Sequence, residues 1–324
     1  MFNKLIIFCA SSLLLLSCSL SRQMVQLPID NTRCSQENRM AYTKADIPAP
    51  LHSLNLDTLL SNRFSAKDLN IANAIGLLPL LMEWAQLQNS LSLQPSLNQQ
   101  VALLQLQQQM NTRLDLASLE ISAVSAELDC EEEKIRQVAA YLSDKEKKAE
   151  TRLTVASIIM GSASAIVTGI LLSGNDKSKV SDGIGVGVGI ADAALGIGIL
   201  TNQKKVALQH PRNVLRELWL ATETSSVYPP SIWYYLNHPA PGNTGGASLR
   251  AQLIANWKKF DQVNASASKK QEKNLDIYFS DGGTYTTEQL ENRAGMYDQI
   301  ESTIKLMKQD LRNLTLSISR GKSQ

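Results

Sequence analysis

Residues 153–173 read LTVASIIMGSASAIVTGILLS, and residues 183–200 read GIGVGVGIADAALGIGIL. A short polar link, residues 174–182, separates these two apolar runs. The first run contains no charged residue, and about 20 apolar or small residues are enough to cross a bilayer as a helix. The pair therefore predicts a central apolar, glycine-rich hairpin over residues 153–200, around which the rest of the chain is organised.

Small residues recur at four-residue steps through both runs. This spacing places them on one face of a helix, where a second backbone can approach closely. In the first run they are Ser157, Gly161, Ala165, Gly169 and Ser173, and in the second run they are Gly185, Gly189 and Ala193. Glycine costs about 1 kcal/mol per helical position relative to alanine, so this many glycines need a reason. The simplest interpretation is two helices whose small-residue faces pack together.

Other interpretations of the hairpin stay open. Residues 183–190 alternate small and large side chains with period two, which also suits a strand or a β-tongue. A helical hairpin can contact a membrane or a protein partner, or it can be the buried core of a soluble bundle. Asp192 argues against a permanent membrane span, because a charge at the bilayer centre costs several kcal/mol.

Heptad patterns on both sides of the hairpin predict long helices. The N-terminal stripe skips one position, Glu131, and comprises Met110, Leu114, Ala117, Ile121, Val124, Leu128, Ile135, Val138 and Leu142. The C-terminal stripe comprises Tyr297, Ile300, Ile304, Met307, Leu311, Leu314 and Ile318. Two such helices flanking one hairpin should pair with each other. The sequence therefore predicts an all-α fold, an elongated antiparallel helical bundle or coiled coil with the hairpin at one end.

Local signals add detail to this helical plan. Ser96 and the Thr286-x-x-Gln289 pattern are expected to cap the starts of the two long helices. Glu132 is expected to pair with Arg136, and Asp144 with Lys148, on the exposed side of the N-terminal helix.

Outside these helices, two segments receive simpler predictions. Residues 202–208 are expected to continue the second hairpin arm as a helix. Residues 228–248, rich in proline and glycine, are expected to be a loop whose aromatic residues pack over the bundle, with a membrane-interface belt or a partner surface as the alternatives.

The N-terminus has the features of an export signal. Lys4 supplies a positive charge and Leu5–Leu16 an apolar stretch. The tetrapeptide Leu15-Leu16-Ser17-Cys18 that follows resembles a bacterial lipobox. This resemblance implies that residues 1–17 are a lipoprotein signal peptide and that Cys18 carries lipid. An ordinary signal peptide cut nearby stays open as the alternative.

Residues 18–50, which are polar and contain Pro28, Pro48 and Pro50, are expected to be the lipid anchor and a polar tether, and residues 51–324 the helical bundle. The lipobox resemblance also implies a location. Ser19 directly after the cysteine, in place of Asp, is similar to lipoproteins sorted to the outer membrane of Gram-negative bacteria.

Two cysteines remain once the export segment is set aside. Cys9 lies in the signal and Cys18 is the anchor candidate, which leaves Cys34 and Cys130. In an oxidising compartment they are expected to form a disulfide, which would close a long loop and add up to about 4–5 kcal/mol of stability. Two free buried thiols are the alternative.

Composition and motifs argue against several function classes. Lys plus Arg total 32 against 30 acidic residues, and this near balance, a net charge of +2, argues against a nucleic-acid-binding protein. The three histidines lack helical zinc spacing, and no nucleophile elbow or phosphate-binding loop occurs. The run Glu131–Glu133 is read as a solvated face. We therefore expect no catalytic site, no metal and no cofactor.

The leading functional hypothesis is a lipid-anchored envelope protein that acts as a helical scaffold or interaction module. Its expected partners are membrane lipid through Cys18, a membrane or protein through residues 153–200, and further copies of itself. The organisation of most of the mature chain, a long helical bundle with a central apolar hairpin, is similar to the cytolysin A and haemolysin BL family of α-helical toxins. That resemblance implies the alternative, a pore-forming protein that inserts the hairpin into membranes.

Overall fold

A computed structural model describes residues 34, 42–91, 95–173, 203–210, 212–239, 246–263 and 277–320, with the side chains of 159–173 left out. Helices dominate these residues, and the sheet among them has only two strands, so the predicted all-α class is confirmed. The chain divides into two compact units. One comprises Met1–Ile29, Gln137–Leu208 and Thr284–Leu290, and the other comprises Asp30–Arg136, Gln209–Gly283 and Glu291–Gln324.

Two helices are much longer than the rest: α5 (Leu97–Ser173) and α11 (Thr287–Arg320). The shorter elements are η1 (Lys44–Asp46), η2 (Leu51–Ser53), α2 (Thr58–Arg63), α3 (Ala66–Ala74), α4 (Leu78–Ser90), β1 (Val206–Gln209), α7 (Val214–Leu220), α8 (Pro230–Asn237), α9 (Leu249–Lys259) and β2 (Gly282–Tyr285). Both predicted caps are present. The Ser96 hydroxyl accepts from the Gln99 backbone N–H at 3.3 Å, and the Thr286 hydroxyl accepts from the Gln289 N–H at 3.3 Å.

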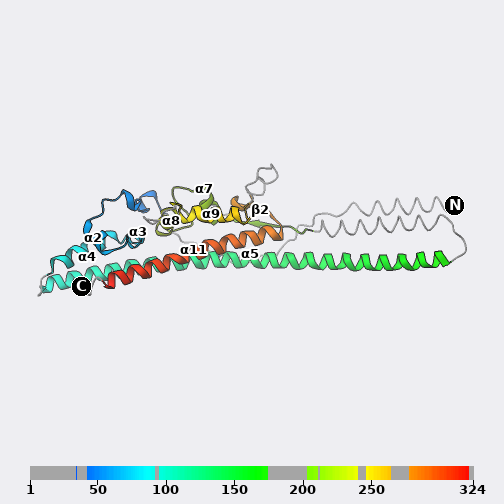
Figure 1. Ribbon diagram of the computed structural model, residues 1–324, viewed down its shortest axis with the longest axis horizontal. Helices are drawn as coiled ribbons and strands as arrows, with labels where there is room; N and C mark the ends of the chain where they lie inside the picture. Colours follow the sequence, from blue (N-terminus) through cyan, green and yellow to red (C-terminus); the bar gives the residue numbers. More distant parts are fainter. Residues whose placement is uncertain are drawn as a thin grey trace. The chain divides into compact units, whose positions relative to one another are not determined.

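Within the larger unit, α11 lies antiparallel along α5 (Figure 1). Lys308 Nζ donates to Ser122 Oγ at 2.8 Å. Further along α5, Glu132 lies beside Asp298 and Glu301. Residue numbers on α11 therefore fall as those on α5 rise, so the predicted antiparallel pairing of the two heptad helices is confirmed.

The apolar stripes form the contact between these helices, which we call the seam. All seven residues of the C-terminal stripe are buried. The N-terminal stripe is buried too, except that Leu114 and Val138 are half-buried. Glu132 differs from expectation: it pairs with Arg136 as predicted, but it is buried, because it faces the carboxylates of α11.

The stripe yields a stability prediction. Ile304→Ala should lower the free energy of unfolding by about 3 kcal/mol, because it removes a fully buried side chain and leaves a cavity. Urea titration followed by circular dichroism measures this change. Leu306→Ala is the matched control on the same helix, since Leu306 is 45% exposed and its truncation should cost well under half as much. Equal losses would contradict the assigned seam.

The aromatic segment predicted as a loop instead contains a helix. Pro230 lies in the first turn of α8, where the missing N–H of proline costs nothing. The Tyr234 hydroxyl accepts from the Leu51 N–H at 3.1 Å and donates to Asn70 Oδ1 at 3.0 Å. These buried hydrogen bonds join α8 to η2 and α3. The predicted loop is therefore wrong for residues 230–237, which are held as a packed helix by partners remote in sequence.

The expected helical continuation through residues 202–208 is also wrong at its end. Val206–Gln209 forms strand β1, which pairs with β2, and the His210 N–H donates to the Asp281 carbonyl at 2.8 Å. Gly283 of β2 permits a close approach, because a Cβ at this position would lie 2.7 Å from Ile277 Cγ1. A helix can form from local hydrogen bonds, whereas a strand requires the distant partner that sequence periodicity did not show.

Cys34 and Cys130 are joined in a disulfide, with Cα atoms 5.6 Å apart, so the predicted pairing is confirmed. The bond connects residue 34 to the middle of α5 across a sequence separation of 96 residues. It thereby fixes the start of the larger unit to the helix that carries the apolar seam.

The disulfide should contribute to stability. Replacing both cysteines, as Cys34→Ser with Cys130→Ser, should lower the free energy of unfolding by up to about 4–5 kcal/mol, because the unfolded chain regains the entropy that loop closure removes. Thermal melting with and without a thiol reductant measures the effect. Reductant should lower the midpoint of the parent protein and leave that of the double variant unchanged. A parent protein that melts identically in both conditions would contradict the role.

Candidate functional site

Helix α5 continues without interruption through the first apolar run to Ser173. The predicted helical form of that arm is confirmed, and the small residues from Ser157 to Ser173 lie on it at four-residue steps. The second arm lies outside the described residues, and with it the predicted packing positions Gly185, Gly189 and Ala193. The candidate lipidation residue Cys18 also lies outside them.

Glu146 of α5 binds two chain segments that are distant from it in sequence. Its Oε1 accepts from the Lys204 backbone N–H at 2.8 Å, and its Oε2 accepts from the Thr287 hydroxyl at 2.9 Å. Hydrogen bonds to an ionised acceptor are about twice as strong as neutral ones. One carboxylate of α5 therefore binds both the chain segment just before β1 and the first turn of α11. The sequence analysis missed Glu146, because no local pattern marks a hydrogen bond between residues this far apart.

Beyond Glu146, α5 presents apolar side chains to solvent. No residue from 143 to 158 is buried. Val155 is 49% exposed and Ile158 is 64% exposed. Ser157 is half-buried, and its hydroxyl donates to the Thr154 carbonyl at 2.8 Å, within the helix. The start of the apolar run thus has side chains available to a partner.

Within the described ranges, no helix combines the length and the hydropathy that a membrane crossing requires.

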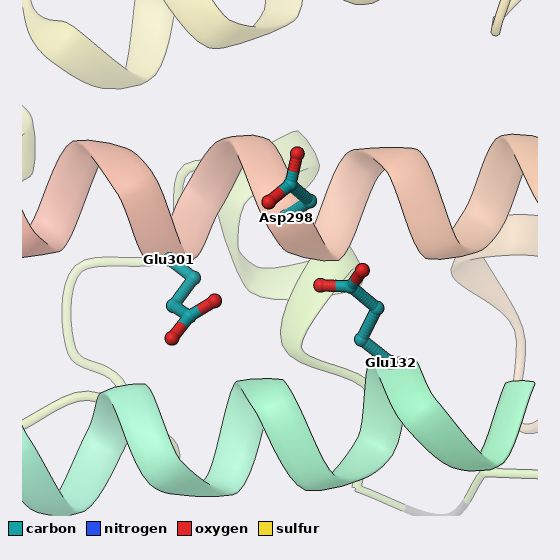
Figure 2. A group of neighbouring side chains, drawn as sticks. All are labelled: Glu132, Asp298 and Glu301. Atoms are coloured by element: carbon teal, nitrogen blue, oxygen red, sulfur yellow. The ribbon is translucent and has the colours of Figure 1, made fainter. Parts of the chain in front are cut away.

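A cluster of three carboxylates spans the seam between α5 and α11 (Figure 2). One oxygen each from Glu132, Asp298 and Glu301 lies within 4.8 Å of the others. Glu132 and Glu301 are buried and Asp298 is exposed. Each buried carboxylate also meets a cation one helical turn further on: Arg136 Nε lies 2.5 Å from Glu132, and Lys305 Nζ lies 2.5 Å from Glu301.

Protonation preferences agree with this pairing. Burial raises the pKa of Glu132, while the hydrogen bond from Arg136 opposes that rise. The hydrogen bond to Glu132 raises the pKa of Arg136, and that to Glu301 raises the pKa of Lys305. A metal ion would have to displace both cations from their carboxylates. The arrangement is one ion pair within each helix, with the carboxylates of the two pairs meeting at the seam, and we assign it no metal.

A second polar cluster surrounds Arg293, which the sequence analysis did not single out. This arginine is only 1% exposed. Its guanidinium donates to the Tyr278 carbonyl at 2.9 Å, to Asn213 Oδ1 at 3.3 Å and to the Tyr297 hydroxyl at 3.2 Å. Asn213 in turn caps α7 and donates to the Tyr278 carbonyl at 2.7 Å. The cluster holds the loop before β2 against α11 and α7, so its role is structural.

His210 lies next to this cluster. Burial lowers its pKa to about 3, and the positive charge of Arg293 acts in the same direction. The folded protein therefore holds a neutral imidazole, while the unfolded chain binds a proton below an ordinary pKa of about 6.5. The stability that this difference provides is complete above about pH 6.5 and is lost as the pH falls toward 3.

His210→Gln should make the protein less sensitive to acid. Between about pH 7 and pH 5, the parent should lose about 2 kcal/mol more than the variant, because protonation of the unfolded histidine is removed. Urea titrations at the two pH values measure the difference. His52→Gln, at an exposed histidine, should behave like the parent. An equally steep loss in His210→Gln would contradict the assignment.

Comparisons with protein-family models, with curated proteins and with solved structures found no match to this chain.

Proposed function

We propose that this chain is a non-enzymatic, lipid-anchored protein of the cell envelope that acts as a helical scaffold or interaction module. In this proposal, lipid on Cys18 holds the protein at the outer membrane, and the apolar hairpin over residues 153–200 contacts a membrane or a protein partner. The single observation that carries the proposal is helix α5. Its 77 residues run without a break from the buried seam into the apolar run.

The exposure pattern of α5 supports this assignment. Its apolar stripe is buried or half-buried as far as Leu142, after which no residue is buried up to residue 158. A helix that leaves its own core while its sequence becomes more apolar needs another surface to cover that part. Glu146 holds the returning chain at this point, so both ends of the hairpin start from one fixed base.

A pore-forming protein is the second candidate. The observation that favours it is the exposure of Val155 and Ile158 directly before the glycine-containing part of the run. A hairpin of this composition could insert into a bilayer, as the organisational similarity to α-helical toxins implies. A lipid anchor fits this candidate less well, because it would hold the protein at the membrane of its own cell.

The anchor gives the first test. Cys18→Ser in the full chain should move the protein out of the membrane fraction or leave it as an uncleaved precursor, because acyl chains supply much of the affinity for the bilayer. Cell fractionation with immunoblotting measures the distribution. Cys9→Ser is the matched control, since it changes a cysteine outside the lipobox and should leave the distribution unchanged. An unaltered membrane fraction and electrophoretic mobility in Cys18→Ser would contradict the anchor.

Dye leakage from liposomes separates the two candidates. The scaffold proposal expects the purified Cys18→Ser chain to leave vesicles sealed, even where it binds them. Leakage that depends on protein concentration would overturn the scaffold in favour of the pore former.

A further inference from the structure

One face of α5 changes from cationic to apolar as the helix approaches the hairpin. Tyr141, Lys145, Lys148, Arg152 and Val155 follow steps of four, three, four and three residues, so they share a face of the helix. All five side chains are exposed. Ile158, also exposed, lies three residues further along the helix, beside the apolar end of this face. We call these six residues the basic-apolar face.

The charges on this face are predominantly positive. Asp144 is the acidic residue on this side, and its carboxylate pairs with Lys148 at 2.7 Å. Lys145 Nζ lies 5.1 Å from the centre of the Tyr141 ring. Within the described part of the chain, Arg152 forms no ion pair. By helical geometry, Glu150 lies on the opposite side of α5, and Glu146, away from the face, is already hydrogen-bonded to Lys204 and Thr287.

The order of these side chains fits the layers of a bilayer surface. Arg152 precedes Val155 by about 5 Å along the helix axis, which is about the depth of a headgroup layer. Long basic side chains can reach from an apolar boundary toward phosphate groups, and tyrosine is enriched at the same level. A protein groove would also accept the apolar residues, but three cations in one row complement an anionic surface in particular.

We propose that the basic-apolar face binds an anionic phospholipid bilayer, with Lys145, Lys148 and Arg152 at the level of the phosphates. This inference rests on the proposed function and specifies its partner: the hairpin meets a membrane, and it does so at a negatively charged surface. Val155 and Ile158 then lie at the boundary with the hydrocarbon layer.

Vesicle flotation tests the inference. The Cys18→Ser chain, which carries no acyl anchor, is mixed with vesicles of phosphatidylcholine alone or of phosphatidylcholine with phosphatidylglycerol. Binding should be stronger to the anionic vesicles and should weaken as salt is raised, since salt screens exposed charges. Adding Lys145→Gln, Lys148→Gln and Arg152→Gln should lower partition onto anionic vesicles about tenfold or more, because each cation near such a surface contributes about fivefold.

A second triple variant is the matched control. Lys258→Gln, Lys259→Gln and Arg312→Gln remove the same charge from exposed positions on α9 and α11, so partition should stay close to that of the parent. Circular dichroism melting checks that both triple variants remain folded. Equal losses in the two would show that only net charge matters, and this result would overturn the inference.

The remaining outcomes separate the inference from the proposed function. Equal binding to both vesicle types, or binding to neither, overturns the anionic bilayer as partner. The proposed scaffold then survives with a neutral membrane or a protein in that place, provided that Cys18→Ser still releases the protein in cell fractionation. Unchanged fractionation of Cys18→Ser contradicts the lipid anchor itself, whatever the vesicles show.

Discussion

Apolar side chains at alternating three- and four-residue steps hold α11 against α5, and the rest of the larger unit is built on that contact. Every stripe residue from Tyr297 to Ile318 is buried, so α11 cannot rotate or slide without exposing part of the row. The disulfide from Cys34 reaches α5 within the same stretch. The Ser231 hydroxyl donates to Glu120 of α5 at 2.6 Å, and Tyr235 donates to Asp310 of α11 at 2.9 Å. Helix α8 is thus positioned by both members of the pair.

Polar groups around this contact restrict how the helices can pair. Glu132 and Glu301 lie in the seam with a cation beside each, and the two Nη atoms of Arg293 donate to carbonyl, amide and hydroxyl oxygens. The Glu132–Arg136 and Glu301–Lys305 pairs each lie within one helix and have half-exposed cations, so a shift of α11 along α5 leaves them intact. Such a shift would separate Lys308 from Ser122. It would also move Arg293 away from Asn213 and the Tyr278 carbonyl. Apolar stripes alone tolerate a shift by one heptad, so the polar groups add selectivity that the stripes lack.

The same helix that carries the seam also carries the surface on which the proposed function depends. Up to Leu142 its heptad stripe is buried or half-buried, and beyond that residue no side chain up to residue 158 is buried. Glu146 marks the transition, because it binds both the returning chain and the start of α11. The proposed membrane contact rests on the exposed side chains of Tyr141, Lys145, Lys148 and Arg152, which lie just before the apolar run.

Periodicity and local chemistry were enough to predict the two long helices, their antiparallel pairing, the caps at Ser96 and Thr286, and the disulfide. Each of these depends on side chains within a few residues of one another, or on the small number of cysteines. The sequence also indicated the apolar run that α5 enters. It could not indicate β1, helix α8, the burial of Glu132, or the roles of Glu146 and Arg293. These features depend on partners brought together by the fold, such as β2 for β1, Asn70 for Tyr234 and Tyr278 for Arg293. Such pairings leave no periodic trace in one sequence, so tertiary packing alone decided them.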